Sequence, residues 1–207
     1  EFGLMDPRIQ SLALFAMGKS HTPWAIGISH AQRKAIYADE HWQDGFYDPK
    51  VPPQKGLSAA RALAMITYRS PQNYEHKFRR DFNRNKDQFE VESYLDHQGE
   101  KLSSRFDANT YITLTKAMDS HDVSRNRGSF REALGSLTIP CLILGIDSDL
   151  LYPIAEQQEL SELIPDSEIN QIHSDYGHDA FLIEFEQINK NLIPFYHSTK
   201  SLYEHHT

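Results

Sequence analysis

Two short apolar runs, residues 9–16 and 140–146, constrain the fold of this chain more than any other feature of its sequence. They read Ile-Gln-Ser-Leu-Ala-Leu-Phe-Ala and Pro-Cys-Leu-Ile-Leu-Gly-Ile. Apolar runs of this length are typical of strands in a parallel sheet that helices cover on both faces. An alternating pattern predicts a third strand over residues 168–173. Helices are expected around these strands over residues 130–137, 155–164 and 179–196. Strands that alternate with helices indicate an α/β fold with a parallel sheet.

Residues 24 to about 125 interrupt this alternation and contain no convincing strand. The spacing of their apolar residues predicts helices over residues 24–39, 57–68, 90–105 and 107–119, with a polar segment at 71–84. The chain therefore divides by pattern into four parts. These are the end of the first half of an α/β core at 1–23, a helical insertion at 24–125, the second half of the core at 126–196 and a flexible tail at 197–207.

The composition excludes several classes of protein. The net charge is −8, with 21 Lys and Arg against 29 Asp and Glu, which argues against nucleic acid as a partner. The densest basic run, residues 76–80, has acidic residues close by and favours a solvated helix face. No apolar stretch approaches the roughly 18–20 residues that span a bilayer, so no membrane partner is expected.

The only cysteine, Cys141, lies inside the second apolar run. A single cysteine excludes a disulfide framework and a cysteine-based metal site. We expect a buried, inert thiol and a cytoplasmic location. The histidines are scattered, and the His205-His206 pair near the end of the chain has nothing beside it to complete a ligand set, so no metal site is predicted.

Acidic and basic side chains follow two successive strands. Asp147 and Asp149 come after the strand at 140–146, and His178 comes after the strand at 168–173. Ligands of open parallel sheets bind at the carboxyl ends of strands, and an acid followed by a histidine is the chain order of a serine-acid-histidine triad. Gly177 suits a tight loop that presents the histidine. The pattern predicts an acid–base pair and leaves the choice between the two aspartates open.

Longer motifs carry a resemblance to a known family. Tyr176-Gly177-His178-Asp179-Ala180-Phe181-Leu182 and Ser148-Asp149-Leu150-Leu151-Tyr152-Pro153 resemble the histidine loop and the acid loop of the homoserine O-acetyltransferase family. The resemblance extends through residues 24–29, 89–95 and 105–111 and covers about residues 1–195. It implies an α/β-hydrolase fold in which the helical insertion is a lid. It also implies that Asp149, four residues before Pro153, is the catalytic acid, His178 the base, and Asp147 a turn residue.

The same resemblance implies two residues that bind substrate. Asp179, directly after the histidine, would hold the amino group of the acceptor, and the alternative is an N-cap of the helix Ala180–Tyr196. Arg61, in the predicted lid, would bind the acceptor carboxylate through a bidentate contact. The alternative for Arg61 is a solvated arginine on a helix surface.

The family's nucleophile lies in a Gly-x-Ser-x-Gly elbow, a motif that occurs nowhere in these 207 residues. The resemblance places this serine fewer than ten residues before Glu1. It implies transfer of an acetyl group from acetyl-CoA to L-homoserine in methionine biosynthesis, with no cofactor, no metal and a homodimer formed through lid helices. L-Serine as acceptor, a succinyl donor and simple ester hydrolysis are alternatives. Because the elbow is missing, an inactive fragment or a non-catalytic subunit is an alternative of another class.

Overall fold

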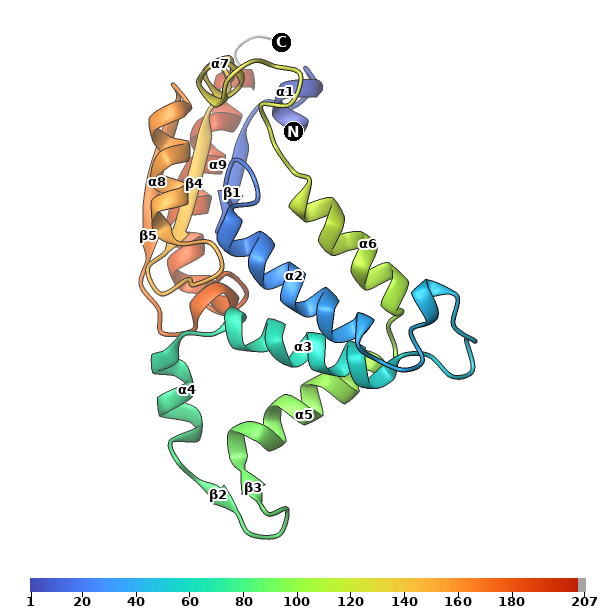
Figure 1. Cartoon of the computed structure of the whole chain (residues 1–207). Helices are drawn as coiled ribbons and strands as arrows, with labels where there is room; N and C mark the ends of the chain where they lie inside the picture. Colours follow the sequence, from blue (N-terminus) through green and yellow to red (C-terminus); the bar gives the residue numbers. More distant parts are fainter. Residues whose placement is uncertain (205–207) are drawn as a thin grey trace. The chain divides into compact units, whose positions relative to one another are not determined.

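The computed structural model describes the backbone of residues 1–204 and the side chains of residues 1–200 (Figure 1). Contacts between residues divide the chain into two compact units. The sheet unit comprises Glu1–Ser20 and the residues from Asp122 onward, and the helical unit comprises His21–His121. The limits of the helical unit differ by a few residues from the insertion expected at 24–125.

The sheet unit is built on three parallel strands. β1 (Leu12–Phe15), β4 (Cys141–Ile146) and β5 (Ser167–Ile172) lie in the order β1-β4-β5. Leu12 pairs with Cys141, which pairs in turn with Ser167, so the three strands start level with one another. Their carboxyl ends therefore meet at one edge of the sheet, which is where the candidate acid and base were expected.

The central strand β4 holds the core of this unit, because all six of its residues are buried. Side chains of a strand alternate between the two faces of the sheet. Leu142, Leu144 and Ile146 belong to one apolar cluster with Ile188 and Phe195 of the C-terminal helix. Cys141 and Ile143 belong to another cluster with Leu160 of the helix between β4 and β5. Burial raises the pKa of the Cys141 thiol to about 11, with a further contribution from the charge of Asp166. The prediction that Cys141 is buried is confirmed.

The prediction for β1 was only partly right. The strand is shorter than the expected run 9–16, and none of its four residues is fully buried. In the described sheet β1 pairs with β4 alone, so its other edge has no neighbouring strand among the described residues. An edge strand retains exposure that a central strand loses.

Helices flank the sheet and connect its strands. They are α1 (Phe2–Met5), α7 (Phe130–Gly135), α8 (Ile154–Leu163), the 3-10 helix η2 (Gly177–Leu182) and α9 (Phe185–Glu204). A capping box between Ser129 and Glu132 begins α7. A flexible tail was expected at 197–207, and α9 continues through these residues as far as Glu204. Residues 205–207, with the His205-His206 pair, lie outside the described residues.

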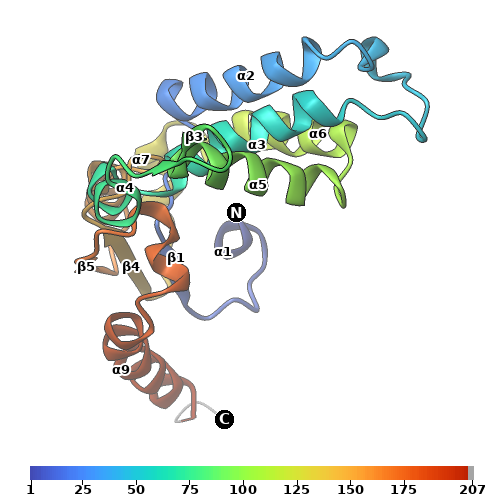
Figure 2. The same ribbon diagram turned by 90° about the horizontal axis from the view of Figure 1, so that it is seen from below.

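The helical unit has five α-helices among its residues, all of which the structure describes, together with the short 3-10 helix η1 (Gln43–Gly45). They are α2 (Pro23–Tyr37), α3 (Gln54–Tyr68), α4 (Pro71–Phe78), α5 (Glu90–Ser103) and α6 (Ala108–Asp119). Figure 2 shows α2, α3, α5 and α6 running alongside one another. Ile36, Leu57 and Ile112 are buried at the centre of this packing. Side chains of Thr22, Ser70 and Asp107 cap α2, α4 and α6.

The helical unit also contains a hairpin, where no strand was predicted. β2 (Phe82–Asn83) pairs antiparallel with β3 (Gln88–Phe89). The Asn83 side chain accepts hydrogen bonds from the backbone N–H groups of Asn85 and Lys86, at 3.1 and 3.2 Å. This turn chemistry was the signal in the sequence. Strands of two residues are too short to show an alternating pattern, which explains why the hairpin was missed.

Among the described residues, no helix combines the length and the apolar character needed to cross a membrane.

Candidate active site

Asp149 and His178 form a hydrogen-bonded pair at the carboxyl end of the sheet. The Nδ1 atom of His178 lies 2.7 Å from Oδ2 of Asp149. A carboxylate oxygen can only accept, so Nδ1 carries the proton in this hydrogen bond. The carboxylate is fully buried, whereas the imidazole side chain keeps 17% of its surface exposed. The base is thus accessible at one edge and the acid is screened from water.

The backbone holds Asp149 in place after β4. Its Oδ1 atom accepts hydrogen bonds from the N–H groups of Leu151 and Tyr152, at 2.8 and 2.9 Å. Together with His178, these groups give both carboxylate oxygens a partner. A short side chain that bonds its own backbone two and three residues ahead is fixed in orientation. The carboxylate therefore presents Oδ2 to the histidine without freedom to rotate.

The loop before His178 requires a glycine. Gly177 adopts φ +65°, in the left-handed region that favours glycine. This agrees with the tight loop expected from the sequence. Two aromatic rings lie near the imidazole, with centroids 5.4 Å away for Tyr152 and 5.2 Å away for Phe181. These two rings were not predicted as part of the site.

Asp147, the rival acid, pairs with a different histidine. Its Oδ2 atom lies 2.9 Å from Nδ1 of His173, and its Oδ1 atom accepts the N–H of Ser174 at 3.1 Å. The exposed fractions are 33% for Asp147 and 74% for His173. Burial raises the pKa of the Asp147 carboxyl, but the hydrogen bonds from Ser174 and His173 outweigh it and hold this pKa below its usual value. Asp147 closes the end of β4 against the end of β5.

Ser148, between the two aspartates, connects the acid loop to the histidine loop. Its hydroxyl donates to the carbonyl oxygen of Ser174 and accepts the N–H of Gly177 at 3.0 Å. Gly177 is the residue before the base, so this one side chain fixes the spacing of the two loops. Ser148 is part of the acid-loop motif, but the motif predicts no role for it.

Asp179 follows the base inside η2, and the expected alternative for it is wrong. Ala180–Tyr196 is not one continuous helix, because Ile183 leaves the helical region and α9 starts at Phe185. Asp179 therefore does not cap α9. Asp179 directly follows His178 in the sequence and is partly buried. It lies in the same unit as the Asp149–His178 pair.

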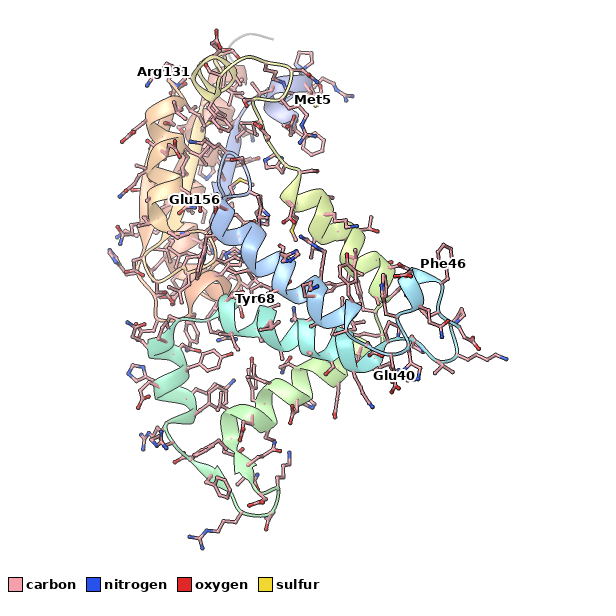
Figure 3. All side chains as sticks on the ribbon, in the orientation of Figure 1. Met5, Glu40, Phe46, Tyr68, Arg131 and Glu156 are labelled. Atoms are coloured by element: carbon pink, nitrogen blue, oxygen red, sulfur yellow. The ribbon has the colours of Figure 1, made fainter. Side chains whose placement is uncertain are left out.

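Arg61 lies in the helical unit, on α3, whereas Asp149, His178 and Asp179 lie in the sheet unit. Its guanidinium carbon lies 5.3 Å from the ring centroid of Tyr68, which Figure 3 labels near the end of α3. Both side chains line a mainly apolar cavity of about 570 Å³ within the helical unit, beside Gln32 and Tyr111. The Tyr111 hydroxyl donates to Gln32 at 2.9 Å. Burial, with a further contribution from Tyr68, raises the pKa of Tyr111.

Arg61 forms no ion pair with a carboxylate among the residues that the structure describes. Its charge is therefore not neutralised within the helical unit. An arginine beside a tyrosine in an apolar cavity has the chemistry to bind a small carboxylate. No group of three histidine, cysteine or acidic side chains in the described part of the chain is placed to hold a metal ion.

Comparisons with known proteins agree with this architecture. A family model described as alpha/beta hydrolase fold matches residues 4–185. A homoserine O-acetyltransferase from Chlorobium chlorochromatii is 53% identical over 199 residues, which are 94% of this chain and 56% of that protein. The chain thus spans about half the length of the curated relatives it matches.

Solved structures give the same fold. A homoserine O-acetyltransferase from Staphylococcus aureus superposes with a TM-score of 0.72 at 28% identity, over 93% of this chain and 53% of that one. Esterase E22 superposes with a TM-score of 0.80 at 16% identity, over 90% of this chain and 54% of that one, a likeness of fold alone. With a buried acid and a histidine at the ends of neighbouring parallel strands, this chain belongs to the α/β-hydrolase family and is similar over most of its length to homoserine O-acetyltransferases.

Proposed function

We propose that these 207 residues form part of an acyltransferase that moves an acetyl group from acetyl-CoA to the hydroxyl of L-homoserine. The observation that carries the proposal is the Asp149–His178 hydrogen bond of 2.7 Å, with the base partly exposed and the acid buried. Relatives at about 50% identity bear the name homoserine O-acetyltransferase. Their name supports the acceptor and the acyl group, and the geometry supports the general base.

The proposed reaction has two half-reactions on one serine. Nε2 of His178 removes the proton of a serine hydroxyl, whose oxygen attacks the thioester carbonyl. The carbon–sulfur bond breaks, the sulfur of coenzyme A takes the proton from His178, and an acetyl-serine remains. The acceptor hydroxyl then attacks the acetyl-serine while His178 removes its proton, and that proton returns to the serine oxygen as the ester product leaves. Asp149 keeps Nδ1 protonated and stabilises the imidazolium in both halves.

The serine is proposed to come from a Gly-x-Ser-x-Gly elbow that precedes Glu1 in a longer polypeptide. No cofactor or metal ion takes part. Mass spectrometry of the native protein after brief mixing with acetyl-CoA is expected to find a polypeptide longer than 23.9 kDa that carries one added acetyl group on such a serine. A native polypeptide of only these residues would overturn the enzyme proposal and favour a non-catalytic subunit.

Arg61 and Asp179 are proposed to bind the acceptor at its two charged ends. Arg61 would contact the carboxylate and Asp179 the amino group, so that an amino acid is recognised by complementary charge. Arg61→Ala is expected to raise the KM for the acceptor by 10-fold or more, on the order of one charged hydrogen bond, with little change in the KM for acetyl-CoA. Arg61→Lys keeps the charge and loses the bidentate geometry, so it should give an intermediate KM. An unchanged acceptor KM in Arg61→Ala would remove this residue from the site.

Initial rates with L-homoserine and L-serine, each with acetyl-CoA and succinyl-CoA, test the substrates. An apolar pocket distinguishes acceptors that differ by one methylene only about 10–200-fold, so both acceptors are expected to react and homoserine to react faster. Higher kcat/KM with serine or with succinyl-CoA would reassign the substrates within the same chemistry. Ester or thioester hydrolysis that no amino acid accelerates would favour a hydrolase.

We further propose a cytoplasmic homodimer that contributes to methionine synthesis, with the helical unit at the dimer interface. Sedimentation of the native protein tests the oligomeric state. A monomer at micromolar concentration would contradict it.

A further inference from the structure

Positive charge is concentrated in one segment of an acidic chain. Residues 77–87 hold five of the 21 Lys and Arg residues and two of the 29 Asp and Glu residues, so this segment carries +3 and the rest of the chain −11. The segment runs from the end of α4 through the hairpin β2–β3 toward α5 (Figure 1). The sequence favoured a solvated helix face for residues 76–80. In the structure, the helix ends at Phe78 and most of these charges lie on the hairpin and its approach.

All five cations of this segment are exposed. Lys77, Arg79, Arg80, Arg84 and Lys86 form no ion pair with a carboxylate among the described residues. Lys86 instead donates to the Ser93 hydroxyl at 2.6 Å. By contrast, Arg33 of the same unit lies 2.6 Å from Asp119. These five charges are thus available to an anionic ligand, although Glu75, Glu90 and Glu92 flank the segment.

Aromatic rings lie among these cations. Phe82 and Phe89, on opposite strands of the hairpin, meet edge to face at 5.3 Å, and they keep 48% and 36% of their surface exposed. The guanidinium carbon of Arg80 lies 5.6 Å from the ring centroid of Phe89. Lys77 lies 4.1 Å from the ring centroid of Tyr94, and its pKa is lowered first by burial and then by repulsion from Arg69. The surface therefore offers positive charge and exposed ring faces together.

We propose that one surface binds the anionic nucleotide end of the coenzyme A thioester donor. This surface consists of Phe82 and Phe89 together with the cations Lys77, Arg79, Arg80, Arg84 and Lys86. That end carries a diphosphate and a 3′-phosphate beside an adenine ring. Arginine and lysine pair with phosphate oxygens, and a purine stacks on an aromatic or guanidinium face. The inference rests on the proposed function, since it assigns a binding surface to the donor of that reaction.

A compact anion suits this surface better than an extended one. A nucleic acid or an anionic membrane would extend beyond eleven residues and meet a protein that is otherwise strongly acidic. The phosphates of one coenzyme A can be held within a single small cluster of cations. The charge distribution thus favours coenzyme A over a nucleic acid or an anionic membrane as the ligand.

The test compares two triple variants of the full protein that change net charge equally. Lys77→Gln/Arg80→Gln/Arg84→Gln neutralises the proposed surface, and Lys34→Gln/Lys50→Gln/Lys101→Gln neutralises three exposed cations elsewhere in the helical unit. The first is expected to raise the KM for acetyl-CoA 10–100-fold, on the order of a few exposed charge contacts, and to weaken calorimetric binding of coenzyme A equally. The KM for S-acetyl-N-acetylcysteamine, which lacks the nucleotide, should not change. The second variant should match the wild type with both donors.

An equal rise in KM for both donors, or the same rise in the control variant, would overturn the proposal. So would binding of a short RNA or of phosphatidylserine vesicles that the first variant loses while coenzyme A binding persists. The calorimetric arm separates this proposal from the proposed function. If coenzyme A binds through these cations but no acyl group is transferred to any amino acid, the proposed function is refuted and the binding surface is supported. If acyl transfer occurs but the first variant binds coenzyme A as tightly as the wild type, the proposed function is supported and the binding surface is refuted.

Discussion

Two acid–histidine pairs lie on the same pair of strand ends, and their comparison shows what distinguishes a candidate catalytic pair. Asp147–His173 and Asp149–His178 have nearly equal Nδ1–carboxylate distances, 2.9 and 2.7 Å. Their environments differ. The carboxylate of the second pair is fully buried and its histidine 17% exposed, whereas the first pair is 33% and 74% exposed.

Burial of the carboxylate determines how firmly the acid–histidine hydrogen bond holds the histidine in place. An exposed ion pair competes with water and contributes little. A buried carboxylate whose oxygens are all occupied keeps its histidine in one tautomer and one orientation. The histidine of the buried, inner pair, Asp149–His178, also has the rings of Tyr152 and Phe181 near it. The inner pair is therefore organised for proton transfer, and the outer pair closes the end of the sheet.

The largest expected effect is a difference in kcat between variants of the two acid–histidine pairs. Asp149→Asn in the full protein should lower kcat by about 10⁴, because an amide stabilises the wrong tautomer of His178. His178→Ala should lower it at least as far. Asp147→Asn, the matched change in the outer pair, should leave kcat within about threefold of the wild type, since small perturbations of an exposed pair are worth under 1 kcal/mol. Steady-state rates with acetyl-CoA and L-homoserine measure this. Equal losses in the two asparagine variants would erase the distinction.

A smaller effect is expected at Ser148, the residue between the pairs. Ser148→Ala removes the hydroxyl that holds the Ser174 carbonyl and the Gly177 N–H, so the His178 loop should lose its fixed spacing from the acid. We expect kcat to fall about tenfold, in line with the loss of one or two hydrogen bonds of about 1 kcal/mol each. The ¹⁵N chemical shifts of His178 should show a mixture of tautomers. Ser148→Thr keeps the hydroxyl and should restore both kcat and the shifts. A wild-type His178 spectrum in Ser148→Ala would show that Ser148 supports only the fold.

The smallest effect concerns stability and pH at the outer pair. The pKa of Asp147 is held below its usual value, so this group binds a proton less readily when the chain is folded. Its contribution to the free energy of unfolding is therefore present above the ordinary value near 3.9 and is lost as pH falls through the lowered pKa. Denaturant melts of wild type and Asp147→Asn should differ by under about 1 kcal/mol at pH 7, and this difference should shrink as the pH falls below the ordinary pKa of an aspartate. A difference that grows on acidification would have the wrong sign for this pair.

The sequence predicted the features that arise from strong local patterns. β4, β5 and most helices of both units follow from apolar spacing, whereas α4 lies in a segment that was expected only to be polar. Asp149 was separated from Asp147 by a family motif. Both aspartates follow the same strand, so pattern alone could not tell which one is buried. The two-residue strands at Phe82 and Phe89 carry no periodicity. The break at Ile183 and the extension of α9 to Glu204 were not indicated by the apolar spacing.

The segments that lead into and out of the helical unit are paired with each other. Ser20 and Asp122 form an antiparallel bridge, and the N–H of Val123 donates to the carbonyl of Lys19 at 3.1 Å. About a hundred residues thus leave and return to the sheet unit at neighbouring points. For protein engineering, this pairing marks a point at which the helical unit can be removed or exchanged. A short turn between Ser20 and Asp122 could close the chain of the sheet unit, and helical units from related enzymes could be exchanged there without redesign of the strands that hold the acid and the base.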